Sequence, residues 1–402
     1  METEAILALI GGVLAVAYLG SLLFRRGRVP DVLWLLLLGG ILGPWLGALD
    51  AAVVERALPL VAALALIVIL FDGAMEVTPR LLRSVGARSL LLSLSVFTAT
   101  SLACSAVAWL ALDLPWPQTL LLGMAFGGAG IAIIVPLARR MDVAPAAMTV
   151  VLLEAVASDI LVILGVYAVA TAVAVGASAG TVAGTVVAAF GIGGALGLAA
   201  GWLWSRWLRI ARENAYVMTF AALVVLYAMV EALNGSGPLA VLLFGILIGN
   251  SRHPHVRPAG APAVPGPTLV AFHNELAFFI RAFFFVAVGA STDWSLLTDR
   301  GFLLAGGALA VTVAAVRFAV AHVVLLGSGL SAWDRMVTGL LSPMGLVTAA
   351  VSVIPHQMGV PGTRHFPGVA AIVIVLTNVL ATVALFVAGW LHARRGRPAP
   401  AA

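Results

Sequence analysis

V-V-L-L-E-A-V-A-S-D-I-L-V-I-L-G-V-Y, residues 150–167, is apolar enough to cross a lipid bilayer, yet it carries Glu154, Ser158 and Asp159. An ionisable side chain at the centre of the hydrocarbon costs roughly a few kcal/mol, so such residues usually face a bundle interior or an ion path. At about 100° per residue, Ser158 lies one turn after Glu154, whereas Asp159 is turned about 140° from Glu154. The two carboxylates therefore point to different neighbours, and one can be paired for structure while the other stays open to a substrate.

The whole chain has the composition of a membrane protein. Of its 402 residues, 62% are hydrophobic and 10% are charged, which excludes an ordinary water-soluble domain. Apolar runs of about 20 residues recur along the chain, and each is long enough to cross a bilayer as a helix. The single cysteine, Cys104, excludes an internal disulfide. We therefore predict an all-α polytopic membrane protein.

Thirteen transmembrane spans are predicted within one transmembrane domain, residues 1–392, which is followed by a short basic cytoplasmic tail, residues 393–402. The N-terminus lacks the basic segment of a cleavable signal peptide, so we expect the first span to remain in the protein. The predicted spans are 5–24, 32–49, 57–73, 89–112, 118–138, 147–170, 181–205, 215–233, 238–250, 270–290, 301–326, 335–355 and 367–391.

The arginines indicate how the chain is oriented. All 22 basic residues are arginine, and two of them, Arg281 and Arg317, lie within predicted spans. If the N-terminus is outside, only Arg56, Arg300 and Arg364 lie outside, and the other seventeen lie in cytoplasmic segments. Cytoplasmic loops of membrane proteins carry an excess of basic residues. The asymmetry therefore predicts an odd number of spans and a cytoplasmic C-terminus, and it explains the net charge of +5 without nucleic acid. The seventeen are Arg25, Arg26, Arg28, Arg80, Arg83, Arg88, Arg139, Arg140, Arg206, Arg209, Arg212, Arg252, Arg257, Arg335, Arg394, Arg395 and Arg397.

Two predicted spans are interrupted at corresponding places. The fifth contains G-G-A-G at residues 127–130, and the twelfth contains S-P-M-G at residues 342–345. Glycine and proline weaken a helix, and broken helices are tolerated in membranes where they line a cavity. If spans 1–6 and 8–13 are two halves joined by span seven, the interruptions match, as in inverted-repeat secondary transporters.

Four segments resemble sodium/proton antiporters of the monovalent cation:proton antiporter-1 family, in its NhaP-like branch. Residues 272–289, F-H-N-E-L-A-F-F-I-R-A-F-F-F-V-A-V-G, resemble the tenth helix of that family, and Leu153–Asp159 resembles its E-S-x-x-N-D helix. Leu70–Gly73 resembles its F-[DE]-G motif, and Ser342–Ala349 resembles its S-P-R-G-L-V-T-A motif. The four matches occur in the family's order and spacing.

The resemblance implies roles for single residues at the ion site. Asp159 corresponds to the aspartate that binds a cation or a proton alternately, and Ser158 takes the place of an asparagine. Asp72 corresponds to an acid that helps to coordinate the ion, and Ala129 to a residue that offers its main-chain carbonyl. No other metal site is expected: His253 and His255, in the polar loop before the tenth span, are interpreted as part of a solvated linker.

The resemblance also implies a structural ion pair. Glu154 corresponds to a glutamate paired with an arginine in the core, for which Arg317 is the favoured partner. Arg281 is the alternative, and it can instead pair with Glu275. By the same resemblance we expect a homodimer in which spans 4–6 and 11–13 form a mobile ion-binding bundle. Spans 1–3 and 7–10 would form the scaffold.

Four polar residues of the family pattern are missing. The family's threonine and aspartate in the fifth helix are Ala129 and Gly130 here, the serine after the motif glutamate is Ala155, and the arginine of S-P-R-G is Met344. Sodium would therefore have fewer side-chain oxygens as ligands. Three outcomes remain open: water and carbonyl groups complete the shell, the preferred ion differs, or transport is impaired.

The leading functional hypothesis is electroneutral one-for-one exchange of Na⁺, or of Li⁺ or K⁺, for H⁺ across the plasma membrane, with alternating access. A carboxylate such as Asp159 can hold a proton or a cation but not both. The alternatives are a potassium efflux path or K⁺:H⁺ antiporter, and a non-transporting membrane regulator on the same scaffold. Enzyme motifs such as H-E-x-x-H and G-x-S-x-G are absent from the sequence, and we expect neither catalysis nor a cofactor.

Overall fold

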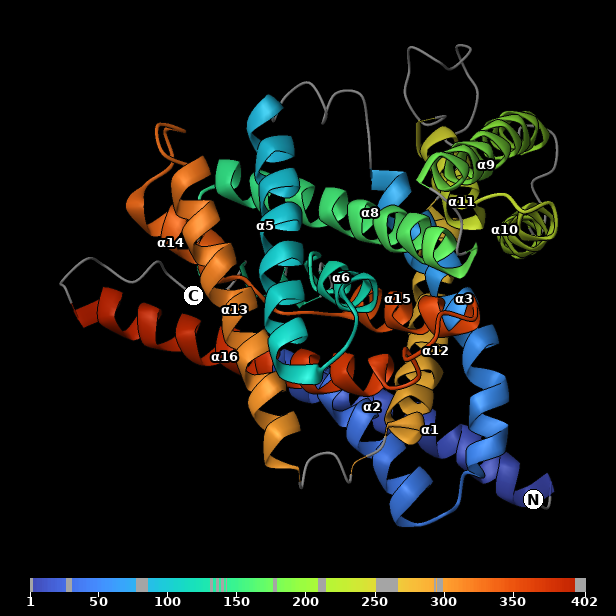
Figure 1. Cartoon of the computed structure of the whole chain (residues 1–402), viewed down its shortest axis with the longest axis horizontal. Helices are drawn as coiled ribbons and strands as arrows, with labels where there is room; N and C mark the ends of the chain where they lie inside the picture. Colours follow the sequence, from blue (N-terminus) through green and yellow to red (C-terminus); the bar gives the residue numbers. More distant parts are fainter. Residues whose placement is uncertain are drawn as a thin grey trace. The chain divides into compact units, whose positions relative to one another are not determined.

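The computed structural model describes residues 3–26, 31–76, 86–130, 133–134, 137–138, 141, 143–175, 179–208, 215–250, 267–292, 294 and 299–394. Within these residues the regular structure is entirely helical (Figure 1). The loop that contains His253 and His255 lies outside them, as do many of the loop arginines. The helices are α1 (Thr3–Arg26), α2 (Asp31–Gly40), the π-helical turn η1 (Ile41–Trp45), α3 (Ala51–Glu76), α5 (Gly86–Leu112), α6 (Trp116–Ala125), α8 (Pro145–Val175), α9 (Ala179–Trp207), α10 (Ala215–Ala232), α11 (Gly237–Asn250), α12 (Pro267–Ser291), α13 (Arg300–Val324), α14 (Ala332–Leu340), α15 (Leu346–Gln357) and α16 (Phe366–Arg394).

Each predicted span overlaps at least one of these helices, so the apolar runs located the helical segments. Six helices in the described part of the chain are long and apolar enough to cross a membrane. They comprise residues 52–75, 88–112, 145–174, 184–207, 300–324 and 366–392. Some of the other predicted spans contain shorter helices, because they are divided or end early. Span two, for example, ends in η1, whose turn contains Pro44.

Both predicted interruptions are present. α6 ends at Ala125, and the chain from Phe126 to Gly130 is not helical. α14 ends at Leu340, and α15 begins only after Gly345, leaving five residues between them without helical structure. The glycine-rich run at 127–130 and the proline at 343 both disfavour a helix, which explains why the helices end at these points.

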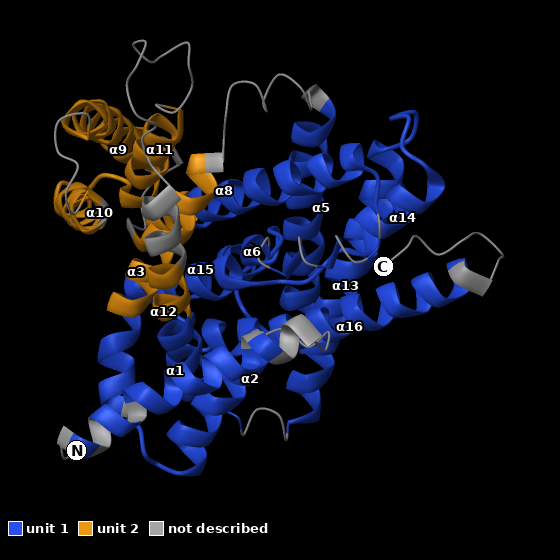
Figure 2. Cartoon of the chain, turned by 180° about the vertical axis from the view of Figure 1, so that it is seen from behind, with its two compact units in different colours: residues 1–59, 85–166, 282–402 blue, residues 60–84, 167–281 orange. Residues whose placement is uncertain are grey.

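The chain divides into two compact units (Figure 2). Unit 1 consists of residues 1–59, 85–166 and 282–402, and unit 2 consists of residues 60–84 and 167–281. In unit 1, α5 packs against α6 and α13, and α13 packs against α14 and α16. α15, the second half of the divided span, packs against both α6 and α16, which brings the two interrupted spans into one contact region.

Unit 2 contains a close pair of helices, α9 and α11, with α10 packed beside both. Gly197 of α9 faces the backbone of Ala240, and Gly201 faces that of Phe244, so neither position has room for a side chain. Small residues allow such close approach of helices in membranes. The turn between α10 and α11 is held by polar groups: the Tyr167 hydroxyl donates to the Gly235 carbonyl at 2.9 Å, and Glu231 accepts from the Gly237 amide at 2.9 Å.

Candidate functional site

Glu154, Ser158 and Asp159 of α8 are all buried in unit 1. Glu154 and Ser158 are fully buried and Asp159 is 8% exposed, although the helix around them is apolar. A buried ionisable group needs hydrogen bonds or an opposite charge. The neighbours of the two carboxylates differ, and that difference gives them different chemistry.

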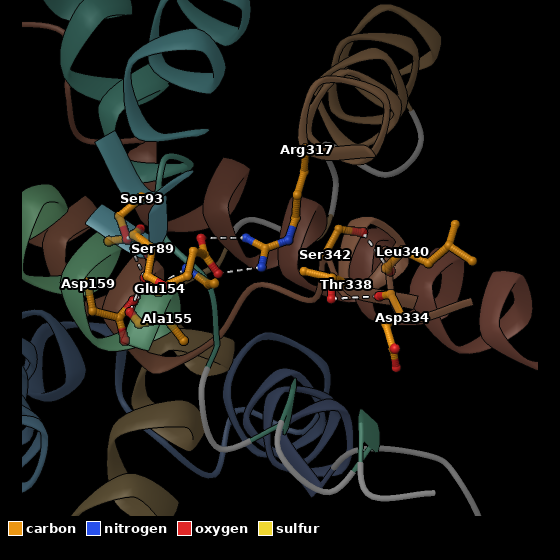
Figure 3. Close-up of polar contacts among 12 residues, drawn as sticks. Ser89, Ser93, Glu154, Ala155, Asp159, Arg317, Asp334, Thr338, Leu340 and Ser342 are labelled. Carbon is orange, nitrogen blue, oxygen red and sulfur yellow. Dashed lines mark hydrogen bonds and ion pairs between the residues drawn. The ribbon is translucent and has the colours of Figure 1, made fainter. Parts of the chain in front are cut away.

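Glu154 is fixed by an arginine from α13. Arg317 Nη1 donates to Glu154 Oε1 at 2.9 Å, and Arg317 Nη2 donates to Oε2 at 2.6 Å (Figure 3). The arginine side chain is 3% exposed and the glutamate side chain is fully buried. A two-bond arginine–carboxylate contact fixes the geometry as well as the charge. Arg317 therefore compensates the charge of Glu154 and links α8 to α13.

Asp159 lies against the main chain of the interruption that follows α6. Its Oδ1 accepts from the Ala129 amide at 3.4 Å. A Cβ atom on Gly128 would lie 3.0 Å from the same oxygen and 3.2 Å from Val162, so a side chain at this position would press on the Asp159 carboxylate. Within the described residues, no arginine forms an ion pair with Asp159. The carboxylate therefore meets a backbone N–H group, and its charge is available to a small cation or a proton.

The hydroxyl group of Ser158 forms its hydrogen bond within α8. Its hydroxyl donates to the Ala155 carbonyl at 3.0 Å, which is a common arrangement of serine within a helix. A hydroxyl oxygen that donates once can still accept or coordinate through its lone pairs. Ser158 thus remains able to offer an oxygen next to Asp159 in the sequence, but its side chain does not titrate.

The two interruptions meet directly. The Gly130 amide donates to the Pro343 carbonyl at 2.9 Å, and a Cβ on Gly130 would lie 3.0 Å from the Gly345 nitrogen. The close approach of Gly345 therefore favours glycine at position 130, where the family pattern has an aspartate. Met344, in place of the motif arginine, is 2% exposed, and its sulfur accepts from the Thr348 hydroxyl at 3.4 Å.

The sequence interpretation did not identify two residues that contact this crossing. Thr377 and Asn378 of α16 are fully buried, and they bind the backbone amide and the backbone carbonyl of Met344. Their signal was present, because a Thr-Asn pair inside an apolar span resembles the Ser-Asp pair of α8. The contact itself depends on tertiary structure and has no counterpart in the local sequence.

The remaining candidate residues belong to unit 2, and their position relative to Asp159 is not described. Asp72 is half-buried in α3, Glu275 is exposed on α12, and Arg281 is half-buried on the same helix. The Arg281 guanidinium lies 5.9 Å from the centre of the Phe278 ring. Within unit 1, the candidate site therefore comprises Asp159, Ser158 and Ala129, and Glu154, which pairs with Arg317, lies on the same helix as Asp159. The roles of Asp72, Glu275 and Arg281 remain predictions from the sequence.

A resident metal centre is not indicated by the described side chains. Among them, no group of three or more histidine, cysteine, aspartate or glutamate residues is close enough to hold a metal ion.

Comparison with known proteins adds a family and a fold. Residues 12–390 match the family described as "Sodium/hydrogen exchanger, transmembrane". The K(+)/H(+) antiporter NhaP of Alkalimonas amylolytica is 27% identical over 389 residues, which cover 94% of this chain and 65% of that protein. The Na(+)/H(+) antiporter 1 of Methanocaldococcus jannaschii is 24% identical over 375 residues, which cover 88% of this chain and 84% of that protein.

The chain is shorter than some of these relatives. It spans 65% of the Alkalimonas protein and 57% of the K(+)/H(+) antiporter NhaP2 of Shewanella baltica, to which it is 27% identical. Among solved structures, the sodium proton antiporter MjNhaP1 from Methanocaldococcus jannaschii at pH 8 superposes with a TM-score of 0.78. That alignment covers 98% of both chains at 21% identity, so it establishes a shared fold.

Proposed function

The chain belongs to the sodium/hydrogen exchanger family of multi-pass membrane transporters, and we propose that it exchanges a monovalent cation for protons through competition at Asp159. Exchange requires one group that binds either the cation or the proton, and access to that group from each side in turn. The observation that carries this proposal is the different environment of the two buried acids. Glu154 is compensated by Arg317, whereas Asp159 contacts the backbone of an interrupted helix.

The proposed ion shell combines side-chain and main-chain oxygens. Asp159 supplies the charge, Ser158 a hydroxyl oxygen, and Ala129 its carbonyl oxygen, as the family resemblance implies. Asp72 is proposed to approach the ion in one of the transport states. Ala155 and Gly130 offer no side-chain oxygen, so water is proposed to complete the shell. Glu154 and Arg317 are proposed to stabilise the bundle without binding the ion.

The alternating movement is proposed to involve spans 4–6 and 11–13 as the ion-binding bundle, moving against a scaffold of spans 1–3 and 7–10. The contacts of α15 with α6 and α16, and of α13 with α5, support a connected bundle. Unit 1 contains these helices, but it also contains α1 and α2, which the proposal assigns to the scaffold. Thirteen membrane crossings, an external N-terminus and a cytoplasmic C-terminus complete the proposed topology in the plasma membrane.

A homodimer is the proposed assembly, by analogy with the family. Light scattering of the purified protein in lipid nanodiscs tests it through the protein mass. A monomer that exchanges ions at the full rate would contradict this part of the proposal.

The cation is the part with a second candidate. Two of the relatives are named K(+)/H(+) antiporters and another is named a Na(+)/H(+) antiporter. The loss of side-chain oxygens at Ala129, Gly130 and Ala155 favours an ion that is more easily dehydrated. K⁺ is therefore proposed as the alternative to Na⁺ for the same exchange reaction.

A transport assay distinguishes these readings. The purified protein is reconstituted into liposomes with an acidic interior and an internal pH dye, and Na⁺, Li⁺ or K⁺ is added outside. We expect at least one cation to dissipate the pH gradient in wild-type vesicles and not in vesicles with Asp159→Asn. If no cation acts on well-folded wild-type protein, the exchanger proposal fails and the non-transporting regulator becomes the better account.

A further inference from the structure

The five residues between α14 and α15, Leu341–Gly345, are all buried and are not part of either helix. Backbone N–H and C=O groups at such a place need partners, because no lipid atom can supply a hydrogen bond. The Leu341 amide continues the hydrogen bonding of α14, because it donates to the Val337 carbonyl at 3.0 Å. The Pro343 carbonyl accepts from Gly130, as described above.

Met344 is held from α16 on both of its backbone groups. Its amide donates to the Thr377 hydroxyl oxygen at 3.3 Å, and the same hydroxyl donates to the Val373 carbonyl at 2.7 Å. The Met344 carbonyl accepts from Asn378 Nδ2 at 2.8 Å. Two consecutive side chains of one helix thus replace both hydrogen bonds that Met344 would have in an uninterrupted helix.

The side-chain amide of Asn378 is oriented by two acceptors. Nδ2 donates to Met344 and also to the Ile374 carbonyl one turn earlier, at 2.7 Å, so the nitrogen and oxygen positions are not interchangeable. The oxygen Oδ1 is buried and has no hydrogen-bond partner among the described residues. A leucine would fill this position without leaving a buried oxygen unpaired. The donor to Met344 is therefore the feature that only the asparagine supplies.

A chain of contacts leads from Asn378 to the site carboxylate. Asn378 holds the Met344 carbonyl, and the adjoining Pro343 carbonyl accepts from the Gly130 amide. Ala129, the residue before Gly130, donates its amide to Asp159 Oδ1. The orientation of the segment 341–345 is thus linked to the main chain that faces Asp159, through three hydrogen bonds and the backbone of Pro343–Met344 and Ala129–Gly130.

We propose that Asn378, together with Thr377, is a positioning residue of the exchanger. The pair fixes the backbone of Met344, and through the crossing at Gly130 it sets the place of Ala129 relative to Asp159. This inference rests on the proposed function, because positioning has a consequence only where Asp159 binds a cation or a proton. The pair also supplies hydrogen-bond partners to the backbone amide and carbonyl of Met344, which lie outside a helix.

The test uses isosteric changes in α16. Asn378→Leu removes the donor to Met344, and Thr377→Val removes the hydroxyl, whereas Thr377→Ser keeps it. Thr382→Val is the matched control, because the Thr382 hydroxyl is buried in the same helix without a partner among the described residues. For each protein, the cation concentration at half-maximal exchange is measured at several pH values in proteoliposomes. Thermal unfolding of the purified protein measures its stability.

Asn378→Leu and Thr377→Val should raise the half-maximal cation concentration about threefold to tenfold, the range that loss of one hydrogen bond produces. They should also shift the pH dependence of exchange. Thr377→Ser and Thr382→Val should match the wild type. If the first two variants lower only the maximal rate or the unfolding temperature, with unchanged half-saturation and pH profile, the role is purely structural and the inference is wrong.

The two proposals fail in distinguishable ways. A folded wild type that exchanges no cation contradicts the proposed function. A wild type that exchanges normally, with an unchanged half-saturation in Asn378→Leu, contradicts the positioning role alone. If Asn378→Leu cannot be purified, the comparison of Thr377→Val with Thr377→Ser decides the matter in the same way.

Discussion

Two carboxylates five residues apart on one helix have different surroundings because they point in different directions. Glu154 is fully buried and meets Arg317, while Asp159 meets the Ala129 amide. A buried ion pair contributes little net stability, since desolvation of both charges offsets their attraction. Its value lies in compensation, because either charge alone would be unpaired inside the protein. Asp159 has no such fixed compensation within the described residues, which suits a group that exchanges partners.

Glu154→Gln should destabilise the protein more than it changes ion preference. The substitution leaves Arg317 charged and uncompensated, a loss that costs about 3–5 kcal/mol in buried pairs. We expect a lower yield and a lower unfolding temperature, measured by fluorescence-detected size exclusion after heating. The double variant Glu154→Gln with Arg317→Met should recover part of the loss. A Glu154→Gln protein that folds normally but no longer binds the cation would reverse the roles assigned to Glu154 and Asp159.

Beside Asp159, the two interrupted spans meet through their main chains. Gly130 and Gly345 approach so closely that a Cβ atom on either would lie about 3.0 Å from the other's backbone. The Gly130–Pro343 hydrogen bond then joins the two interruptions. α16 completes the arrangement through Thr377 and Asn378.

Gly130→Ala should disturb this crossing. Its Cβ would lie 3.0 Å from the Gly345 nitrogen and 3.1 Å from its Cα, and backbone atoms yield less than flexible side chains. Overpacking of this kind costs roughly 1–3 kcal/mol. Gly307→Ala in α13 is the control, because among the described residues no atom outside the adjoining helix backbone lies within 4 Å of its Cβ position. Alanine also favours helix over glycine by about 1 kcal/mol. Unfolding temperatures should fall for the first variant and hold or rise for the second; equal behaviour would mean that the crossing is not tightly packed.

The sequence alone could predict the helices and both interruptions, since these follow from apolar periodicity and from glycine and proline. It could not predict the partners of the interrupted backbone. Thr377 and Asn378 find Met344 only through the packing of α15 on α16. Likewise, Glu231 binds the amide of Gly237 at the start of α11, whereas the sequence indicates only an acid near the end of a span. The π-helical turn at Ile41–Trp45 also has no clear sequence signal apart from Pro44.

Two properties of the whole molecule bear on transport: the uneven distribution of its arginines and the number of protons that it exchanges for each cation. In the predicted topology most arginines lie on one side of the membrane, and the predicted spans carry few ionisable groups. Of these, Glu154 and Arg317 form a compensated pair. We therefore propose that the transported proton and the transported cation bind the same carboxylate, Asp159.

The proposed topology predicts that the two ends of the chain lie on opposite sides of the membrane. Single cysteines replacing Glu2 and Ala399, each in a Cys104→Ala background, are labelled in intact cells with a membrane-impermeant maleimide. Cysteine 2 should react from outside, and cysteine 399 only after the cells are opened, as the arginine asymmetry requires. Labelling of both from the same side would contradict an odd number of crossings.

Exchange through a single carboxylate should carry no net charge. The Ser158 hydroxyl does not titrate near neutral pH, so one proton leaves Asp159 for each monovalent cation that binds. Currents recorded on a solid-supported membrane should be absent in vesicles whose exchange is shown by tracer uptake. A sustained current whose sign follows the cation gradient would mean that a second group, with Asp72 the first candidate, also carries a proton.

Competition between cation and proton at Asp159 can be measured as the dependence of exchange on cation concentration at several pH values. One-site competition predicts that the half-maximal cation concentration rises as the pH falls, approaching about tenfold for each pH unit, while the maximal rate at saturating cation stays constant. Asp159→Asn, which keeps the shape of the side chain but cannot bind a proton or a cation by charge, should show no exchange at any pH. A half-maximal concentration that does not change with pH, or sustained exchange by Asp159→Asn, would contradict the account.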